Sequence, residues 1–208
     1  SMPMVRRSTH ISAIRSMTKL PGKILFLVIF NIFTITTICA SPQTVDPQLR
    51  KLLTEAINSS ESFDDRFHAE VWLLDMSNRL ERFVKDKQTR LEMLKQIHLE
   101  ASRAGLQPEL VLAVIEVESH FDSYAISSAG AQGIMQVMPF WLDEIGRPND
   151  NLIVMKTNLR MGCTILKYYM DMENNDLHEA LARYNGSKGS RVYSNKVLDA
   201  LRKNWYKS

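Results

Sequence analysis

Cysteine is scarce in this sequence, which contains only Cys39 and Cys163 among its 208 residues. Cys39 lies in an apolar leader, so the body of the chain cannot form a disulfide of its own if the leader is removed. Cys163 falls on the apolar side of a predicted helix, which favours a buried structural thiol over a nucleophile. No group of cysteines and histidines has metal-ligand spacing, so we expect neither a metal site nor a cofactor.

The body of the chain also lacks an excess of basic residues. The formal net charge is +3, but residues 1–40 contain five basic residues and no acidic one. Residues 41–208 therefore contain 21 basic and 23 acidic residues, a net charge of −2. This balance excludes nucleic acid as the expected partner, because nucleic-acid-binding domains usually carry a basic surface. The sequence shows no internal repeat, and its length suits one domain with an N-terminal appendage.

Residues 1–40 have the layout of a secretory signal, with a basic segment followed by an apolar run at residues 24–40. The run of 17 residues is shorter than the ~20 that usually span a bilayer. We therefore expect an exported protein and favour a cleaved signal over a retained membrane anchor. A lipid anchor is not expected, because no small residue directly precedes Cys39.

A helix with an apolar surface nearly all round is predicted between Pro108 and Phe121. Gly105 suits the left-handed end of a preceding helix, and Pro108 suits the first turn of a new one. Seven of the eight residues at 110–117 are apolar, so this helix should lie inside the domain. An acidic residue on such a helix requires an explanation.

Glu118 is the acidic residue with the drier predicted surroundings on this helix. At 100° per residue it lies over Val111, Val114 and Ile115, whereas Glu116 lies on another side. Burial disfavours the charged carboxylate, so the pKa of Glu118 should be raised, as in a general acid. Alternatively, Glu118 emerges at the helix end and is solvated or paired with an arginine. Glu116 is interpreted as a structural acid.

Most of the remaining chain has helical periodicity, which predicts an all-α fold. Helical patterning occurs at residues 47–58, and helices are predicted at 87–104, from Thr157 or Asn158 onward, at 180–184 and near the C-terminus. A further helix carries two apolar stripes, which predict packing on two neighbours: Phe63, Phe67, Val71 and Leu74 form one, and Trp72, Met76, Leu80 and Phe83 form the other. A short helical turn at 133–138 is expected to end at Pro139.

Two separated motifs carry a family resemblance. The first runs from Glu118-Ser119-His120-Phe121 through Ser127-Ser128-Ala129-Gly130-Ala131-Gln132-Gly133-Ile134-Met135-Gln136-Val137-Met138-Pro139. The second is Ala180-Leu181-Ala182-Arg183-Tyr184-Asn185-Gly186, and between them Asn158 and Gly162 have a matching spacing. Together they resemble the soluble lytic transglycosylases, relatives of goose-type lysozyme, over roughly residues 100–190.

The resemblance implies a lysozyme-like, goose-type helical domain with a substrate cleft at residues 100–208. It leaves residues 41–99 as an N-terminal helical extension and residues 1–40 as a signal peptide or anchor. It implies a protein that acts on peptidoglycan glycan strands. Together with the predicted export signal, this predicts a periplasmic location, and we expect a monomer. Cell-envelope machinery is a further possible partner, and membrane contact is expected only through residues 24–40.

The resemblance also assigns roles to individual residues. Glu118 would protonate the bridging oxygen between N-acetylmuramic acid and N-acetylglucosamine, then accept the proton of the muramyl C6 hydroxyl as a 1,6-anhydro ring closes. Tyr184 would stabilise positive charge near the anomeric carbon. The substrate-binding residues implied by the motif matches are Ser119, Ser127, Met135, Gln136, Asn158 and Asn185.

Two other functions are compatible with this fold. A lysozyme-like muramidase would need a second acid at the cleft, for which Asp122 is the only nearby candidate, because Glu116 lies on the wrong side of the helix. A non-catalytic peptidoglycan-binding or secretion-system accessory protein would keep the fold without the chemistry.

Overall fold

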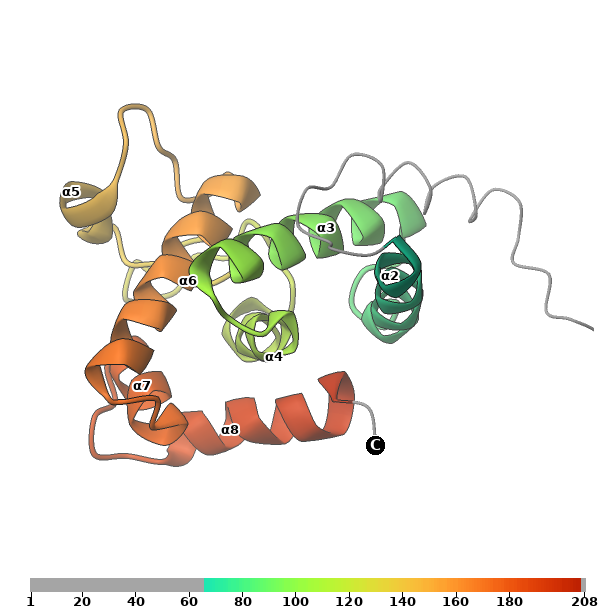
Figure 1. The fold of residues 1–208 in the computed structure, drawn as a ribbon. Helices are drawn as coiled ribbons and strands as arrows, with labels where there is room; N and C mark the ends of the chain where they lie inside the picture. Colours follow the sequence, from blue (N-terminus) through green and yellow to red (C-terminus); the bar gives the residue numbers. More distant parts are fainter. Residues whose placement is uncertain (1–65, 207–208) are drawn as a thin grey trace, which may run out of the picture. The chain divides into compact units, whose positions relative to one another are not determined.

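The computed structural model describes residues 66–206, which form an array of helices joined by loops and turns (Figure 1). The all-α prediction is confirmed for this part of the chain, where the only β pairings are isolated bridges. The predicted signal at residues 1–40, the helical patterning at 47–58 and Phe63 lie outside the described residues. The elements are α2 (Arg66–Leu80), α3 (Lys87–Ala104), α4 (Pro108–Ser119), α5 (Trp141–Ile145), α6 (Met155–Met172), α7 (Leu177–Tyr184), α8 (Val192–Ala200) and the π-helical turn η1 (Leu201–Trp205).

Helix α4 is the buried helix that the sequence predicts. It lies between α3 and α8, as Figure 1 shows, and its residues from Leu110 to Ile115 are all buried. Gly105 ends α3 in the left-handed conformation with φ of 70°, and Pro108 occupies the start of α4. Both boundaries agree with the sequence prediction because each depends on local backbone preference.

The apolar side of α2 differs from the prediction. Phe67 and Val71 are exposed, whereas the helix buries Ala69, Leu73, Met76 and Leu80. The Phe67 stripe is therefore not a core face, although α2 does contact two elements, α3 and η1. Buried Arg90 joins α2 to α3 by donating hydrogen bonds to the hydroxyl of Ser77 and to two carbonyl oxygens of the connecting turn.

The loop after α4 contains a tight turn where a helical turn was predicted. Gln132 and Val137 exchange two backbone hydrogen bonds of 3.0 and 2.9 Å, and the residues between them form the turn. Gly133 and Gln136 have left-handed φ values of 74° and 50°, which interrupt a right-handed helix. A Cβ on Gly133 would lie 2.4 Å from the Asn158 side chain, so only glycine permits this approach.

Helix α6 begins at Met155, slightly before the predicted start, and buries Leu159, Gly162, Cys163 and Leu166. Helix α6 packs closely against Met135 at Gly162, because a Cβ there would lie 2.5 Å from the Met135 sulfur. Cys163 is buried as predicted, and burial raises the pKa of its thiol well above the usual range. The short helix α5 was not predicted.

The helix predicted near the C-terminus is present as α8 and η1, and its apolar residues Val197, Leu201 and Trp205, spaced four apart, are all buried. Trp205 packs with Phe83 and Phe121, whose ring centroids lie 4.9 Å apart. This aromatic cluster fixes the chain just after α4, where His120 and Phe121 both have positive φ values of 51° and 68°. Such backbone costs about 1–3 kcal/mol per residue and is maintained by surrounding packing.

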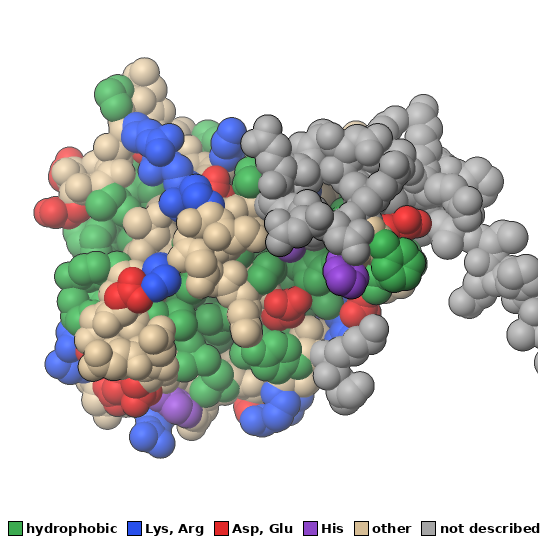
Figure 2. All heavy atoms as spheres, viewed as in Figure 1, with side chains coloured by type: hydrophobic (Ala, Val, Ile, Leu, Met, Phe, Trp, Pro, Cys, Tyr) green, Lys and Arg blue, Asp and Glu red, His purple; other side chains and the backbone are tan. Residues whose placement is uncertain are grey.

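Acidic and basic side chains are interspersed on the face seen in Figure 2, consistent with the near balance of charge in the body of the chain. Within residues 66–206, no helix combines the length and the apolar character needed to cross a bilayer.

Candidate active site

Glu118 lies in the last turn of α4, beside a pocket of about 340 Å³. Its side chain is partly buried, and burial raises the pKa of its carboxyl from the ordinary 4.5 to about 7. Desolvation outweighs the opposing effect of the Tyr193 hydroxyl, whose hydrogen bond favours the charged form. A carboxyl with this pKa is substantially protonated near neutral pH and can both donate and accept a proton.

The raised pKa predicts a pH-dependent loss of stability. Between pH 4.5 and 7 the folded state holds the Glu118 proton more tightly than the unfolded state, so stability falls as pH rises through this window. Glu118→Gln lacks this titration. Relative to the parent, the variant should gain up to about 3 kcal/mol between pH 4 and pH 8. Urea unfolding at both pH values measures the difference, and a constant difference would contradict the raised pKa.

Among the described residues, Tyr193 is the hydrogen-bond partner of the Glu118 carboxylate, and sequence analysis missed it. Its hydroxyl donates a 2.6 Å hydrogen bond to Glu118 Oε1 from the first turn of α8. Burial and the nearby carboxylate both raise the pKa of Tyr193, so it remains a proton donor. Tyr193 occupies the same helical stripe as Val197, Leu201 and Trp205, at intervals of four residues, so extending that stripe by one turn would have identified it.

Removing the Tyr193 hydroxyl should raise the pKa of Glu118 further. Tyr193→Phe deletes the one hydrogen bond from the described residues that lowers this pKa, while keeping the ring in place. A titration of the Glu118 carboxyl followed by ¹³C NMR should give a value above that of the parent. Tyr184→Phe is the matched control, because the Tyr184 hydroxyl donates to the Met135 carbonyl oxygen rather than to Glu118. An unchanged or lower pKa in Tyr193→Phe would contradict this arrangement.

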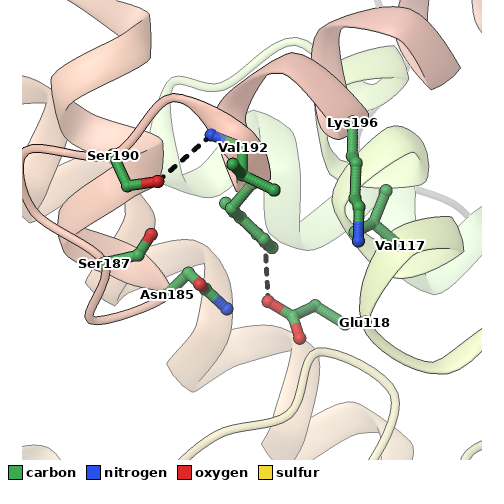
Figure 3. A pocket seen from close by; sticks show the side chains of 8 residues that line it. Val117, Glu118, Asn185, Ser187, Ser190, Val192 and Lys196 are labelled. Carbon is green, nitrogen blue, oxygen red and sulfur yellow. Dashed lines mark hydrogen bonds between the residues drawn. The ribbon is translucent and has the colours of Figure 1, made fainter.

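The pocket beside Glu118 is lined mainly by polar side chains. Figure 3 shows Glu118 and Asn185 entering it from opposite sides, with Lys196 on a further side. Ser187, in the loop after α7, also lines it, and its buried hydroxyl has no hydrogen-bond partner among the described residues. Hydroxyl and amide groups of this kind suit a ligand with many hydroxyls. Glu118 is the only acidic residue among those that line the pocket.

Tyr184 lies close to Glu118 at the end of α7. Its hydroxyl donates a 2.8 Å hydrogen bond to the carbonyl oxygen of Met135. Burial and the Glu118 charge raise the pKa of Tyr184 well above its ordinary value, so this hydroxyl stays protonated. Tyr184 therefore connects α7 to the turn at Gly133–Gln136 near the Glu118 carboxylate.

The structure corrects the predicted placement of Met135 and Asn158. The Met135 side chain is fully buried against Gly162 and Cys163, so it does not line a sugar groove. Asn158 is also fully buried. Its side-chain oxygen accepts from the Met135 N–H at 2.7 Å, and its amide nitrogen donates to the carbonyl oxygens of Gln132 and Leu152. Both side chains are buried beneath the turn at Gly133–Gln136 and support it.

Three other predicted residues make hydrogen bonds to backbone groups of the loop after α4 and do not line the pocket beside Glu118. The Ser119 hydroxyl donates to the Ile134 carbonyl oxygen at 2.7 Å, which ties the end of α4 to the turn. The Ser127 hydroxyl accepts from the Ala131 N–H. The Gln136 amide nitrogen donates to the carbonyl oxygens of Ala125 and Gly133, which leaves the Gln136 side-chain oxygen for a ligand.

The neighbouring acids have other roles. Glu116 accepts hydrogen bonds from Asn204 and Trp205 and lies 3.4 Å from Arg82, as expected of a structural acid. Asp122 is exposed and accepts from the N–H of Tyr124. Within residues 66–206, no cluster of three metal-ligating side chains is present.

Comparisons with known proteins agree on one family. The profile described as Transglycosylase SLT domain matches residues 95–204, more than half of the chain. A 39-residue segment is 54% identical to membrane-bound lytic murein transglycosylase C of Actinobacillus pleuropneumoniae serotype 5b, and it covers 19% of this chain and 11% of that protein. Over 120 residues the chain is 32% identical to the protein of the same name from Salmonella typhimurium, with coverage of 49% and 33%.

A solved structure of an inactive mutant of the lytic transglycosylase Slt from Pseudomonas aeruginosa is also similar, with a TM-score of 0.43 and 21% identity. The similarity covers 79% of this chain and 36% of that one. The matched segments thus span between 11% and 33% of the length of the two curated relatives.

Proposed function

The chain belongs to the transglycosylase SLT-domain family, and from this we propose that it is a lytic transglycosylase acting on peptidoglycan. The reaction cleaves the β-1,4 bond between N-acetylmuramic acid and N-acetylglucosamine without water. The observation that carries the proposal is a single partly buried carboxyl, Glu118, with a pKa near 7 in a polar pocket that has no second acidic residue. Hydrolases of glycosidic bonds usually use two carboxylates.

In the first step Glu118 is the general acid. Its proton passes to the bridging oxygen as the bond from that oxygen to C1 of the muramyl residue breaks, and the N-acetylglucosamine leaves with a free 4-hydroxyl. Positive charge develops at C1 during this step. The hydroxyl of Tyr184 lies near the carboxylate, and its oxygen is proposed to stabilise that charge.

In the second step Glu118 is the general base. The muramyl C6 hydroxyl attacks C1, its proton returns to Glu118, and the 1,6-anhydro ring closes. The carboxyl is thereby restored to its starting form. Tyr193 orients the carboxylate through its hydrogen bond, and a pKa near the operating pH suits a group that performs both transfers.

Substrate groups are proposed to bind around this centre. Asn185 and the unpartnered hydroxyl of Ser187 are suited to sugar hydroxyl or N-acetyl groups, as is the side-chain oxygen of Gln136. Ser119 and Asn158 act indirectly by holding the turn that carries Gln136. A role for Ser127 in substrate binding stays a prediction.

We also propose an envelope location and a revised domain boundary. The signal-like residues 1–40, together with relatives named as membrane-bound, support export. The domain is proposed to include all of α3, because Leu94, Ile97 and Ala101 are buried in one core on both sides of residue 100. The extension then comprises α2 and the residues before it. A monomeric state stays a prediction.

Product analysis tests the proposed reaction. Purified peptidoglycan digested with the full chain should release fragments with 1,6-anhydromuramic acid ends, each lighter by one water than the hydrolytic product in mass spectrometry. Reducing muramic acid ends would identify a muramidase instead. Intact strands after prolonged incubation with a folded protein would favour the non-catalytic accessory role.

A further inference from the structure

A second pocket of about 400 Å³ adjoins the pocket beside Glu118. It lies between the end of α4 and the C-terminal elements α8 and η1. Both pockets are lined by Val117 and Lys196, so these two residues form their common wall. The second pocket is lined by Glu116, Val117, His120, Lys196, Asp199 and Lys203, together with two further residues of the C-terminal segment.

Lys196 is the charged group around the two pockets that has no partner among the described residues. In the second pocket, Glu116 is bound by Arg82, Asn204 and Trp205. Asp199 pairs with Arg202 and with Lys203, the latter at 3.7 Å. Lys196 is exposed and is not among the causes of the raised pKa of Glu118. Its charge is therefore available to an anionic group of a ligand.

The position of Lys196 indicates which part of the substrate it contacts. If Glu118 reaches the bridging oxygen, as the proposed function requires, the two sugars that share this oxygen lie at the first pocket, and the muramyl residue is assigned to the side that meets the common wall. The peptide stem leaves that sugar through its lactyl group and must extend into an adjoining space. Figure 3 shows the Lys196 side chain directed toward Val117, along the wall shared with the second pocket.

We propose that the second pocket binds the peptide stem of the muramyl residue and that Lys196 pairs with a carboxylate of that stem. This inference rests on the proposed function and extends it to the peptide part of the substrate. Peptide stems carry free carboxylates, and the pocket offers one unpaired cation beside acids that are already neutralised. Lys196 is then a residue for substrate discrimination rather than for bond cleavage.

The test is a double-mutant cycle between Lys196 and the substrate carboxylates, measured as binding in the Glu118→Gln background so that cleavage plays no part. Soluble glycan strands are used with free stem carboxylates, or after the carboxylates are converted to amides. Amidation should weaken binding about threefold, within the range of an exposed ion pair. Lys196→Gln should weaken binding to the free stems by the same factor, with no further loss on amidated strands.

Two control variants and a third substrate sharpen the test. Lys196→Arg keeps the charge and should retain the preference for free carboxylates. Lys156→Gln makes the same change in net charge at an exposed position on α6 that lines neither pocket, and it should bind both strands like the parent. Strands whose stems have been removed by an amidase carry only the lactyl carboxylate and should bind like amidated strands.

Specific outcomes would overturn the assignment. If amidation and Lys196→Gln weaken binding independently, Lys196 does not contact a stem carboxylate. If strands without stems bind as tightly as strands with free stem carboxylates, the lactyl carboxylate rather than the stem is the ligand of Lys196. Failure of the parent to form anhydro ends would instead refute the proposed function. The double-mutant cycle measures binding without cleavage, so its result is independent of that one.

Discussion

Replacing Glu118 with glutamine is expected to reduce the rate of anhydro-product formation about 10²–10⁴-fold, the usual contribution of a positioned proton-transfer group. Glutamine keeps the size of the side chain and can still accept the Tyr193 hydrogen bond, but it neither donates nor accepts the transferred proton. The measurement is the release of anhydro-muropeptides from purified peptidoglycan, quantified by chromatography and mass spectrometry at fixed protein concentration.

The same role of Glu118 predicts the direction in which the activity of the parent changes with pH. The first step requires protonated Glu118, so kcat/KM should fall as pH rises through about 7, where this carboxyl ionises in the free protein. Glu109→Gln is the matched control. Glu109 lies at the other end of α4, where it accepts a hydrogen bond from the Trp72 side chain. A Glu118→Gln variant that retains parental activity would remove Glu118 from the reaction.

Helix boundaries and buried faces were predictable wherever the conformational preference of the local backbone agrees with the packing of the helices. The end of α3 at Gly105, the start of α4 at Pro108 and the inner side of α8 follow from backbone preference and from apolar residues at helical spacing. The same logic located Glu118, because a carboxyl on an apolar helix is expected to have a raised pKa. These features depend on residues close together in the sequence.

Predictions failed where contacts distant in sequence decide the structure. The composition of the Gly133–Gln136 segment is typical of a helix, yet two left-handed residues and hydrogen bonds with the Asn158 side chain make it a turn. On α2, the stripe containing Phe67 is as apolar as the buried one, so periodicity alone could not select the core face. In both cases the deciding contact comes from another element.

The sequence selected residues that lie near one another in the structure, but some of their side chains support the loop instead of lining the pocket. Motif matching brought Glu118, Tyr184 and Asn185 into one region, but it cannot distinguish a side chain that faces the ligand from one that supports the loop behind it. Met135 contributes its backbone carbonyl to Tyr184 while its side chain fills the core. Tyr193 lies outside both motifs.

Asn158→Ala should destabilise the fold by about 3–5 kcal/mol, because it leaves one N–H and two carbonyl groups without their partner, at about 1–3 kcal/mol for each one that stays buried. Such a loss is a large share of the ~5–15 kcal/mol that typically stabilises a domain. Urea unfolding of the parent and the variant measures the difference. Asn195→Ala, at an exposed position on α8, should change stability by no more than about 0.5 kcal/mol.

The outcome separates two roles for Asn158. A residue that contacts the sugar would lower substrate affinity when truncated and leave the free energy of unfolding nearly unchanged. A residue that holds the turn would lower stability first and would impair activity only through displacement of the Met135 carbonyl and the Gln136 amide. Because Asn158 is fully buried and all three of its bonds go to backbone groups, the second pattern is expected. Parental stability combined with weakened substrate binding would restore the ligand-binding role that the motif first suggested.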